Sequence, residues 1–293
     1  MTMTSPKPPT IHFNTGHNEE LAIDEPELTE LVRLLELNGM QPATLTTALT
    51  HVSLAECQVV VLGNPRDSLF TSDEVSALVS FVESGGGLLI VSGATIFGKG
   101  GDVARKTNLN EIANRFQFEF ATKALAQPVD VSDEAIKAVP SHDHPILVGI
   151  GPLLLASGVS LLAEDTKTHL FRAANIPGTP TVAIITEKKE GRIIAFGGGT
   201  FFFNDYIQLS NHEHLLVQIF RWLSGMPLNL PVQRLSPPQP ILDEASATEA
   251  IAVLRQQLDK IETELSSLKE VINTSVKEME KLVRHFQDEE KET

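Results

Sequence analysis

Short apolar runs without polar alternation mark the first two-thirds of the chain. Val59 to Leu62 and Leu88 to Val91 are two such runs, and they predict strands of a parallel sheet that is covered on both faces. Between them, Thr71 and Glu74 have the spacing of a helix-capping box, and Gly85 to Gly87 can end that helix. The pattern therefore predicts an α/β protein with a doubly wound, mostly parallel sheet, organised around residues 59–101.

Similar reasoning assigns the other elements of this region. We expect Ser210 and Glu213 to form a second capping box, and residues 121–180 to decorate the main sheet. Phe116, Phe118 and Phe120 alternate as in a half-buried strand. The predicted strands are Ile11 to Phe13, Gln41 to Leu45, and an antiparallel hairpin of Thr181 to Thr186 with Arg192 to Gly197; the predicted helices are Pro26 to Asn38, Thr107 to Arg115, and one opened by Ser210.

The pattern changes after Pro227. Prolines recur to position 240, which predicts a semi-rigid linker, and a 3.5-residue repeat follows. We expect the apolar seam of this repeat to pair with another chain, by default as a dimer, because a single helix would leave it exposed to water. A helix folded back on its own domain is the alternative. The seam residues are Ile251, Leu254, Leu258, Ile261, Leu265, Leu268, Ile272, Met279, Leu282 and Phe286.

These patterns predict the following division of the chain. The segments are a disordered N-terminus (1–10), an α/β domain (11–227), a Pro-rich linker (228–243), a coiled coil (244–288) and an acidic tail (289–293).

Charge and composition reduce the number of possible functions. The formal net charge of −15 argues against general binding to nucleic acid, because such binding depends on clustered Lys and Arg. No stretch is apolar for the length that a membrane-spanning helix needs. The one cysteine, Cys57, permits no disulfide within the chain and is expected to be a buried thiol. We expect a cytoplasmic protein without a cofactor.

Several motifs together resemble the GIFT domain, over roughly residues 10–225. They are Phe13-Asn14-Thr15, Gly63-Asn64-Pro65-Arg66, Phe70-Thr71, the Gly85 to Gly87 helix end, His144-Pro145-Ile146 with Gly149, and the segments GRIIAFGGGTFF and NHEHLLVQIFRWLSG. The GIFT domain begins a subunit of the intraflagellar transport B complex, and related modules occur in gliding-motility ABC-transporter accessory proteins. The resemblance implies the fold of class I glutamine amidotransferases and ThuA-like proteins.

The sequence departs from the enzymes of that superfamily at the nucleophile. The amidotransferases place a cysteine on a tight turn after a strand, whereas the equivalent turn here reads Ser92-Gly93-Ala94-Thr95. This difference favours a scaffold or adaptor without catalytic activity, and a serine–histidine–acid cluster in the structure would argue against it.

Ligands of open α/β sheets bind beyond the carboxyl ends of the strands. The loops expected at that edge hold a candidate site for a small anionic or carbohydrate ligand: Asn14, Thr15, Gly16, Asn64, Arg66, Ser92, Gly93, Lys99, Asn204 and Asp205. The alternative is that Asn and Gly serve turn geometry, and that Arg66 pairs with a neighbouring carboxylate.

Two further chemical interpretations compete with simple structural ones. Ser92 is a candidate nucleophile with His17, His212 or His214 as the base and Asp205 or Glu213 as the orienting acid, but it lacks the usual sequence frame. His142 and His144 alternate as metal ligands do on a strand, but no third ligand follows at short spacing.

The sequence therefore favours a scaffold that binds a protein or a small ligand, self-associates through its heptads, and acts in a transport or motility-related complex. A hydrolase or carbohydrate-binding relative of ThuA-like proteins is the alternative.

Overall fold

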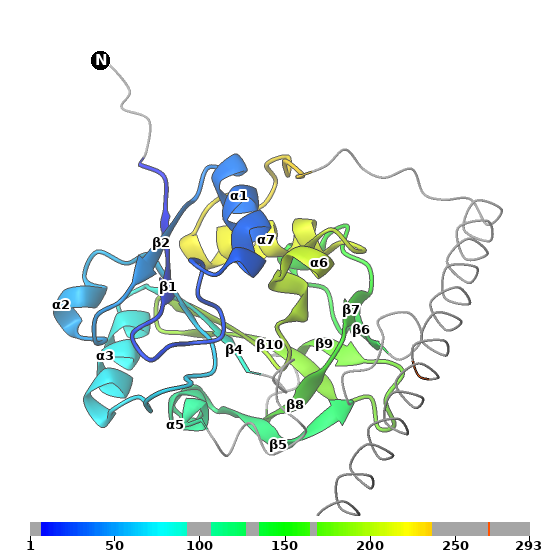
Figure 1. The fold of residues 1–293 in the computed structure, drawn as a ribbon, viewed down its shortest axis with the longest axis horizontal. Coiled ribbons are helices and arrows are strands. Elements are labelled where there is room, and N and C mark those ends of the chain that lie inside the picture. The colour runs from blue at the N-terminus through cyan, green and yellow to red at the C-terminus, as the bar shows by residue number, and fades with distance from the viewer. Residues whose placement is uncertain (1–6, 93–106, 127–134, 165–168, 236–268, 270–293) are drawn as a thin grey trace, which may run out of the picture. The chain divides into compact units, whose positions relative to one another are not determined.

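The computed structural model describes residues 7–92, 107–126, 135–164, 169–235 and Lys269 (Figure 1). Apart from Lys269, the predicted coiled coil lies outside the described residues, and so do all ten of its seam residues, the acidic tail, and the site candidates Gly93 and Lys99. Those predictions, and the division into domains, stay predictions.

The described elements follow one another along the chain in this way. The strands are β1 (Thr10–Asn14), β2 (Gln41–Leu45), β3 (Val59–Leu62), β4 (Gly87–Val91), β5 (Phe118–Ala126), β6 (Ile136–Pro140), β7 (Leu153–Leu155), β8 (Gly158–Ala163), β9 (His169–Ala173), β10 (Thr181–Lys188) and β11 (Gly191–Phe196). The helices are α1 (Thr29–Leu37), α2 (His51–Leu54), α3 (Ser72–Glu83), α5 (Leu109–Ala113), α6 (Asn204–Ile207) and α7 (His212–Ser224), with short 3-10 turns η1 (Pro26–Leu28), η2 (Asn114–Phe116), η3 (Pro145–Leu147) and η5 (Thr200–Phe202).

The main sheet is mixed. Nine of the described strands join in the order β2-β1-β3-β4-β11-β10-β9-β6-β7. The pairs from β2 through β11 are parallel, and the pairs from β11 through β7 are antiparallel. The predicted α/β class is confirmed. Residues 121–180 do more than decorate this sheet, because they supply β6, β7 and β9 to it, while β5 and β8 pair separately.

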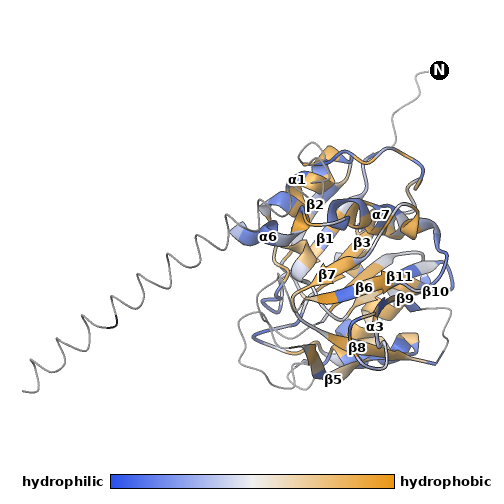
Figure 2. Ribbon diagram, turned by 90° about the vertical axis from the view of Figure 1, so that its right-hand side faces the viewer, coloured by the Kyte–Doolittle hydropathy of each residue, from blue (hydrophilic) through white to orange (hydrophobic). Residues whose placement is uncertain are grey.

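Each central strand buries both of its faces. Val59 and Val61 belong to the apolar layer that holds α1 and α7, whereas Val60 and Leu62 belong to the layer that holds α3 and α5. This alternation follows from the two-residue period of a strand. Figure 2 shows the hydrophobic strands lying between these two helical layers. Helices on both faces explain why the runs lack polar residues.

The predicted capping box of α3 is confirmed. The Thr71 side chain accepts a hydrogen bond from the Glu74 amide, and the Glu74 carboxylate accepts one from the Thr71 amide. The second predicted box is wrong. α7 begins after Asn211 without a side-chain cap, because Ser210 takes a φ of 52° and donates its hydroxyl hydrogen to the Pro152 carbonyl.

The aromatic alternation also ends earlier than predicted. Phe116 lies in η2, and Gln117 takes a left-handed φ of 65°, so β5 begins only at Phe118. The turn between η2 and β5 therefore removes Phe116 from the strand. No helix among the described residues is both long enough and apolar enough to cross a membrane.

Residues 228–235, the first half of the predicted linker, pack against the α/β domain. Arg221, which is 2% exposed, donates hydrogen bonds to the carbonyls of Leu230 and Pro231 at 2.6 and 3.0 Å. The amide of Leu235 donates to Glu213 at 2.9 Å. Val232 and Leu235 also contact the hydrophobic core. We call residues 228–235 the C-terminal strap.

Candidate functional site

The carboxyl ends of β1 and β3 meet where the strand order reverses. From β1 the chain crosses to β2 on one side, and from β2 it crosses back to β3 on the other side of β1. Asn14 ends β1, Asn64 follows β3, and Ser92 follows β4, so the sequence correctly placed these three residues at one edge. This is the position where open α/β sheets bind their ligands.

Asn14 holds the loop after β1 in place. Its side-chain amide, 1% exposed, donates a hydrogen bond to Glu19, and the other Glu19 oxygen accepts from the His17 amide at 3.1 Å. Glu19 itself is completely buried. The loop therefore closes around its own carboxylate.

Asn64 joins three strand-end loops. Its Nδ2 donates to Glu20 at 2.9 Å, its Oδ1 accepts from the Ser92 hydroxyl at 3.1 Å, and its carbonyl accepts from the Glu20 amide at 3.1 Å. Gly63 lets the loop after β1 pack closely, because a Cβ at this position would lie 3.0 Å from the Leu21 amide nitrogen and press on that loop. The loops after β1, β3 and β4 thus form one hydrogen-bonded unit.

A serine, a histidine and a glutamate are aligned at the same edge. The His17 ring places Nε2 2.9 Å from a Glu74 carboxylate oxygen and Nδ1 2.8 Å from the Ser68 hydroxyl. The Phe70 ring lies 4.5 Å from the imidazole, centroid to centroid. Glu74 and His17 are buried, whereas Ser68 is exposed. A serine–histidine–acid set is therefore present, although not around Ser92, and it argues against the expectation of a scaffold without catalytic activity.

The surroundings shift the pKa values of these carboxyl groups in opposite directions. Burial raises the pKa of Glu19 and that of Glu20, against the hydrogen bonds from their partners. Burial also acts to raise the pKa of Glu74. Hydrogen bonds from Thr71, His17 and the Leu49 amide together outweigh it, so that the pKa of Glu74 is lowered. Glu74 is thus held as an anion facing His17.

The remaining candidates of the first and second loops have structural partners. Arg66 pairs with Glu25 at 3.1 Å, so it has the carboxylate partner that the structural alternative predicted. The Thr15 amide donates to the Leu45 carbonyl at 2.9 Å. Gly16 is exposed, and a Cβ there would lie 3.3 Å from the Thr47 carbonyl oxygen. None of these contacts involves a ligand, so the binding role of this loop stays a prediction.

Asn204 and Asp205 do not make hydrogen bonds with this cluster. Asn204 accepts from the Glu30 amide at 2.9 Å and donates to the Pro26 carbonyl at 2.9 Å and the Thr29 hydroxyl at 3.0 Å. Its side chain therefore fastens α6 to the start of α1. Asp205 is exposed beside it.

The proposed catalytic partners of Ser92 are wrong. Ser92 is 1% exposed and bonds to Asn64 rather than to a histidine. His212 is completely buried between Leu154 and Tyr206, with which its ring nitrogens make hydrogen bonds of 3.2 and 2.7 Å. Glu213 accepts from the strap at Leu235. His212 and Glu213 thus serve packing, whereas His17 faces Ser68 and Glu74 instead of Ser92.

His142 and His144 have separate roles. The His144 ring accepts from the Ile146 amide at 3.3 Å and lies edge-on to Trp222, while the His142 ring contacts the His169 carbonyl. Within the described part of the chain, no group of three or more His, Cys, Asp or Glu residues is arranged to hold a metal ion.

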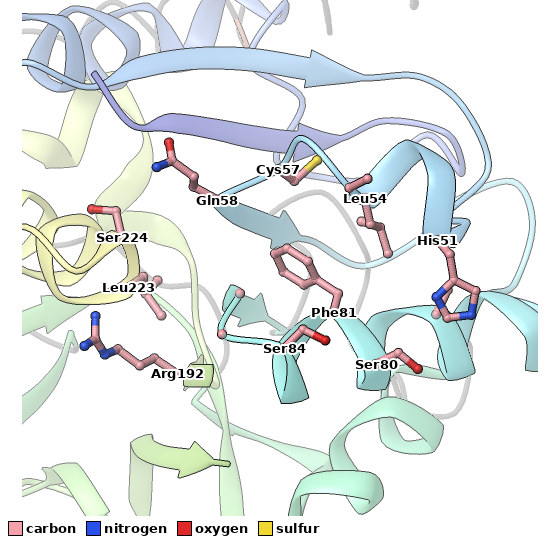
Figure 3. A pocket seen from close by; sticks show the side chains of 14 residues that line it. His51, Leu54, Cys57, Gln58, Ser80, Phe81, Ser84, Arg192, Leu223 and Ser224 are labelled. Atoms are coloured by element: carbon pink, nitrogen blue, oxygen red, sulfur yellow. The ribbon is translucent and has the colours of Figure 1, made fainter. Parts of the chain in front are cut away.

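A pocket of 430 Å³ lies at the opposite, amino-terminal edge of the sheet (Figure 3). Gln58 and Gly86, which precede β3 and β4, line it together with Arg192 and Phe81. Burial raises the pKa of the Cys57 thiol there to about 11, so it is a poor nucleophile. The pocket shares no residue with the cluster at the carboxyl edge.

Sequence reasoning missed Glu19, Glu20 and Ser68 as members of this cluster, and it gave Glu74 only a capping role. Two adjacent acids directly after the segment Asn-Thr-Gly-His-Asn were a usable signal. Ser68 had none, because its partner His17 lies far away along the chain.

Comparison with known proteins agrees with this fold. A family model described as a domain of unknown function (DUF4350) matches residues 28–220. No curated protein matches the chain in sequence.

Three solved structures are similar in fold. The mmIFT52 N-terminal domain has a TM-score of 0.63 at 18% identity, covering 75% of this chain and 100% of that one. The cytoplasmic protein STM1381 from Salmonella typhimurium LT2 has a TM-score of 0.53 at 14% identity, covering 73% and 98%. A ThuA-like protein from Parabacteroides merdae has a TM-score of 0.52 at 14% identity, covering 80% and 96%. The predicted likeness in fold to the GIFT domain and to ThuA-like proteins is thereby confirmed, and the likeness to the amidotransferases stays a prediction.

Proposed function

The chain belongs to the family described as a domain of unknown function (DUF4350), and from this premise we propose that it is a scaffold or adaptor. The loops at the carboxyl edge bind a protein partner, and the C-terminal heptads join the chain to a second copy. Amidotransferase chemistry is not part of this function. Both the binding role and the assembly role go beyond what the fold alone carries.

The observation that carries this proposal is the state of Ser92. It stands directly after β4, where the amidotransferases have their exposed cysteine, but its side chain is buried and its hydroxyl donates to Asn64. A nucleophile must reach its substrate. Ser92 instead stabilises the loops, which favours a rigid platform over an amidotransferase active site.

The exposed side chains of the loop after β3 favour a protein partner over a small ligand. Leu69 is 55% exposed, and the exposed Arg66 lies in the same loop. Arginine is enriched at protein interfaces, and Leu69 adds apolar surface beside it for a partner to cover. By contrast, the polar groups beneath, such as Asn64 and Glu20, already bond to each other. A metabolite would have to displace those bonds.

The assembly half of the proposal is tested in the full chain. Leu258→Asp with Leu265→Asp places two charges on the seam, and Gln256→Asp with Ser266→Asp places the same charges off it. In light scattering, we expect the wild type and the off-seam variant to have a mass of at least twice 31.9 kDa. The seam variant should be monomeric. A monomeric wild type would refute the assembly role.

A further inference from the structure

Ser68, His17 and Glu74 form a second chemical feature of the carboxyl edge, distinct from the turn that follows β4. We propose that Ser68 is a nucleophile that is activated by His17 and Glu74 and attacks small carboxylic esters. This activity is additional to the proposed binding function and does not rest on it.

The arrangement fixes which nitrogen of His17 carries the proton. Glu74 is an acceptor, since one carboxylate oxygen accepts from Thr71 and the other accepts from the Leu49 amide at 3.2 Å. The His17 Nε2 atom, 2.9 Å away, must therefore donate to Glu74. In the neutral ring, this leaves a lone pair on Nδ1, which faces the Ser68 hydroxyl at 2.8 Å. That geometry suits a general base.

The exposure of the three residues follows the same division of roles. Ser68 is exposed and can reach a substrate, whereas His17 is 8% and Glu74 is 5% exposed. A buried carboxylate holds the imidazole in one tautomer and stabilises the imidazolium that forms during attack. The Phe70 ring packs against His17 and restricts its rotation. The base is thus oriented before a substrate arrives.

The chemical step is acyl transfer. The Ser68 oxygen attacks the ester carbonyl carbon as its proton passes to His17 Nδ1. The bond between the carbonyl carbon and the alcohol oxygen then breaks, and the alcohol leaves with the proton from His17. Water attacks the acyl-serine in the same way and releases the acid. Ser68 and Leu69 are both exposed, so we expect short acyl groups that lie on the surface beside Leu69.

The test uses a fluorophosphonate, because the serine oxygen displaces fluoride from phosphorus and leaves a stable adduct. We expect the full-length wild type to be labelled on the peptide that contains Ser68, and the label to be absent in Ser68→Ala. Ser72→Ala is the control, because Ser72 is also exposed and lies nearby in the chain, at the start of α3. No label on Ser68 would overturn the proposal.

A second variant tests activation by His17 without changing His17 itself. In Ser68→Cys, the new thiol faces the same imidazole, so we expect iodoacetamide to alkylate it at least about tenfold faster than the thiol of Ser76→Cys, which is exposed in α3 away from the N-terminus of that helix. Cys57 reacts slowly in both, as its pKa of about 11 keeps it protonated. Equal alkylation rates would show that His17 and Glu74 only hold the loops together, and would overturn the proposal.

Discussion

His17 lies with its Nε2 atom 2.9 Å from a carboxylate oxygen of Glu74, and this pair joins the loop after β1 to the first turn of α3. Because the same carboxylate completes the α3 capping box, one side chain couples a helix terminus to a strand-end loop. The site and the fold therefore share Glu74, and changes there are expected to affect both.

Glu74→Ala should be strongly destabilising. It removes the acceptor for the Thr71 and Leu49 amides and for His17, leaving buried donors without partners. We expect a loss of about 3 kcal/mol in the free energy of unfolding, measured with urea. Glu83→Ala is the control, since Glu83 pairs with Lys189 at the surface and should contribute less than about 1 kcal/mol.

The stabilisation by Glu74 should depend on pH. Its pKa is lowered in the folded protein, so the stabilisation is present above the ordinary glutamate pKa and is lost as the pH falls through the lowered value. The difference between wild type and Glu74→Ala should therefore shrink in acid. A difference that grew as the pH fell would contradict the assignment of Glu74 as the buried anion.

The contribution of Glu19 to stability should depend on pH in the opposite direction, and Glu19→Gln tests this. Burial raises the pKa of Glu19 in the folded state, so ionisation costs stability as the pH rises from the ordinary glutamate pKa through the raised one. A glutamine is never charged and can still bond to Asn14. We expect the stability of the variant relative to wild type to increase between about pH 4.3 and pH 7.5. Urea unfolding at several pH values measures it, and a flat difference would contradict the prediction.

Substitution of the adjacent residues Asn204 and Asp205 should affect stability to different degrees. Asn204→Ala removes three hydrogen bonds between α6 and the start of α1, and should lower the free energy of unfolding by about 2 kcal/mol. Asp205→Ala alters an exposed side chain and should change it by less than about 0.5 kcal/mol. Thermal unfolding of both variants checks this. Equal effects would mean that Asn204 does not fasten the two helices.

Arg221→Met should release the C-terminal strap. The guanidinium group bonds to the carbonyls of Leu230 and Pro231, and methionine fills similar space without donors. Trypsin should then cleave after the exposed Arg234 at least about fivefold faster, because local opening limits proteolysis. Arg33→Met, at an exposed position, is the control. Unchanged cleavage would show that Arg221 does not hold the strap.

The sequence predicted the central sheet well, for a physical reason. Val59 to Leu62 and Leu88 to Val91 have helices on both faces, and this environment demands continuous apolar runs that are visible in the chain itself. The Thr71 cap was equally readable, because both of its partners lie within one turn.

The errors arose where partners are distant along the chain. Ser210 and Glu213 have the spacing of a capping box, but each bonds to another segment, at Pro152 and at Leu235. Likewise, Ser68 meets His17 only after the sheet is assembled. Local spacing carries no information about such contacts, so the strap and the Ser68 cluster required the structure.

The central claim is that the carboxyl-edge loops are the binding surface, and capture of proteins from a lysate of the source organism tests it most directly. Leu69→Asp alters the exposed rim of those loops, and Leu162→Asp alters an equally exposed position on β8. We expect wild type and Leu162→Asp to retain the same partner and Leu69→Asp to lose it. Retention of that partner by Leu69→Asp would contradict the account.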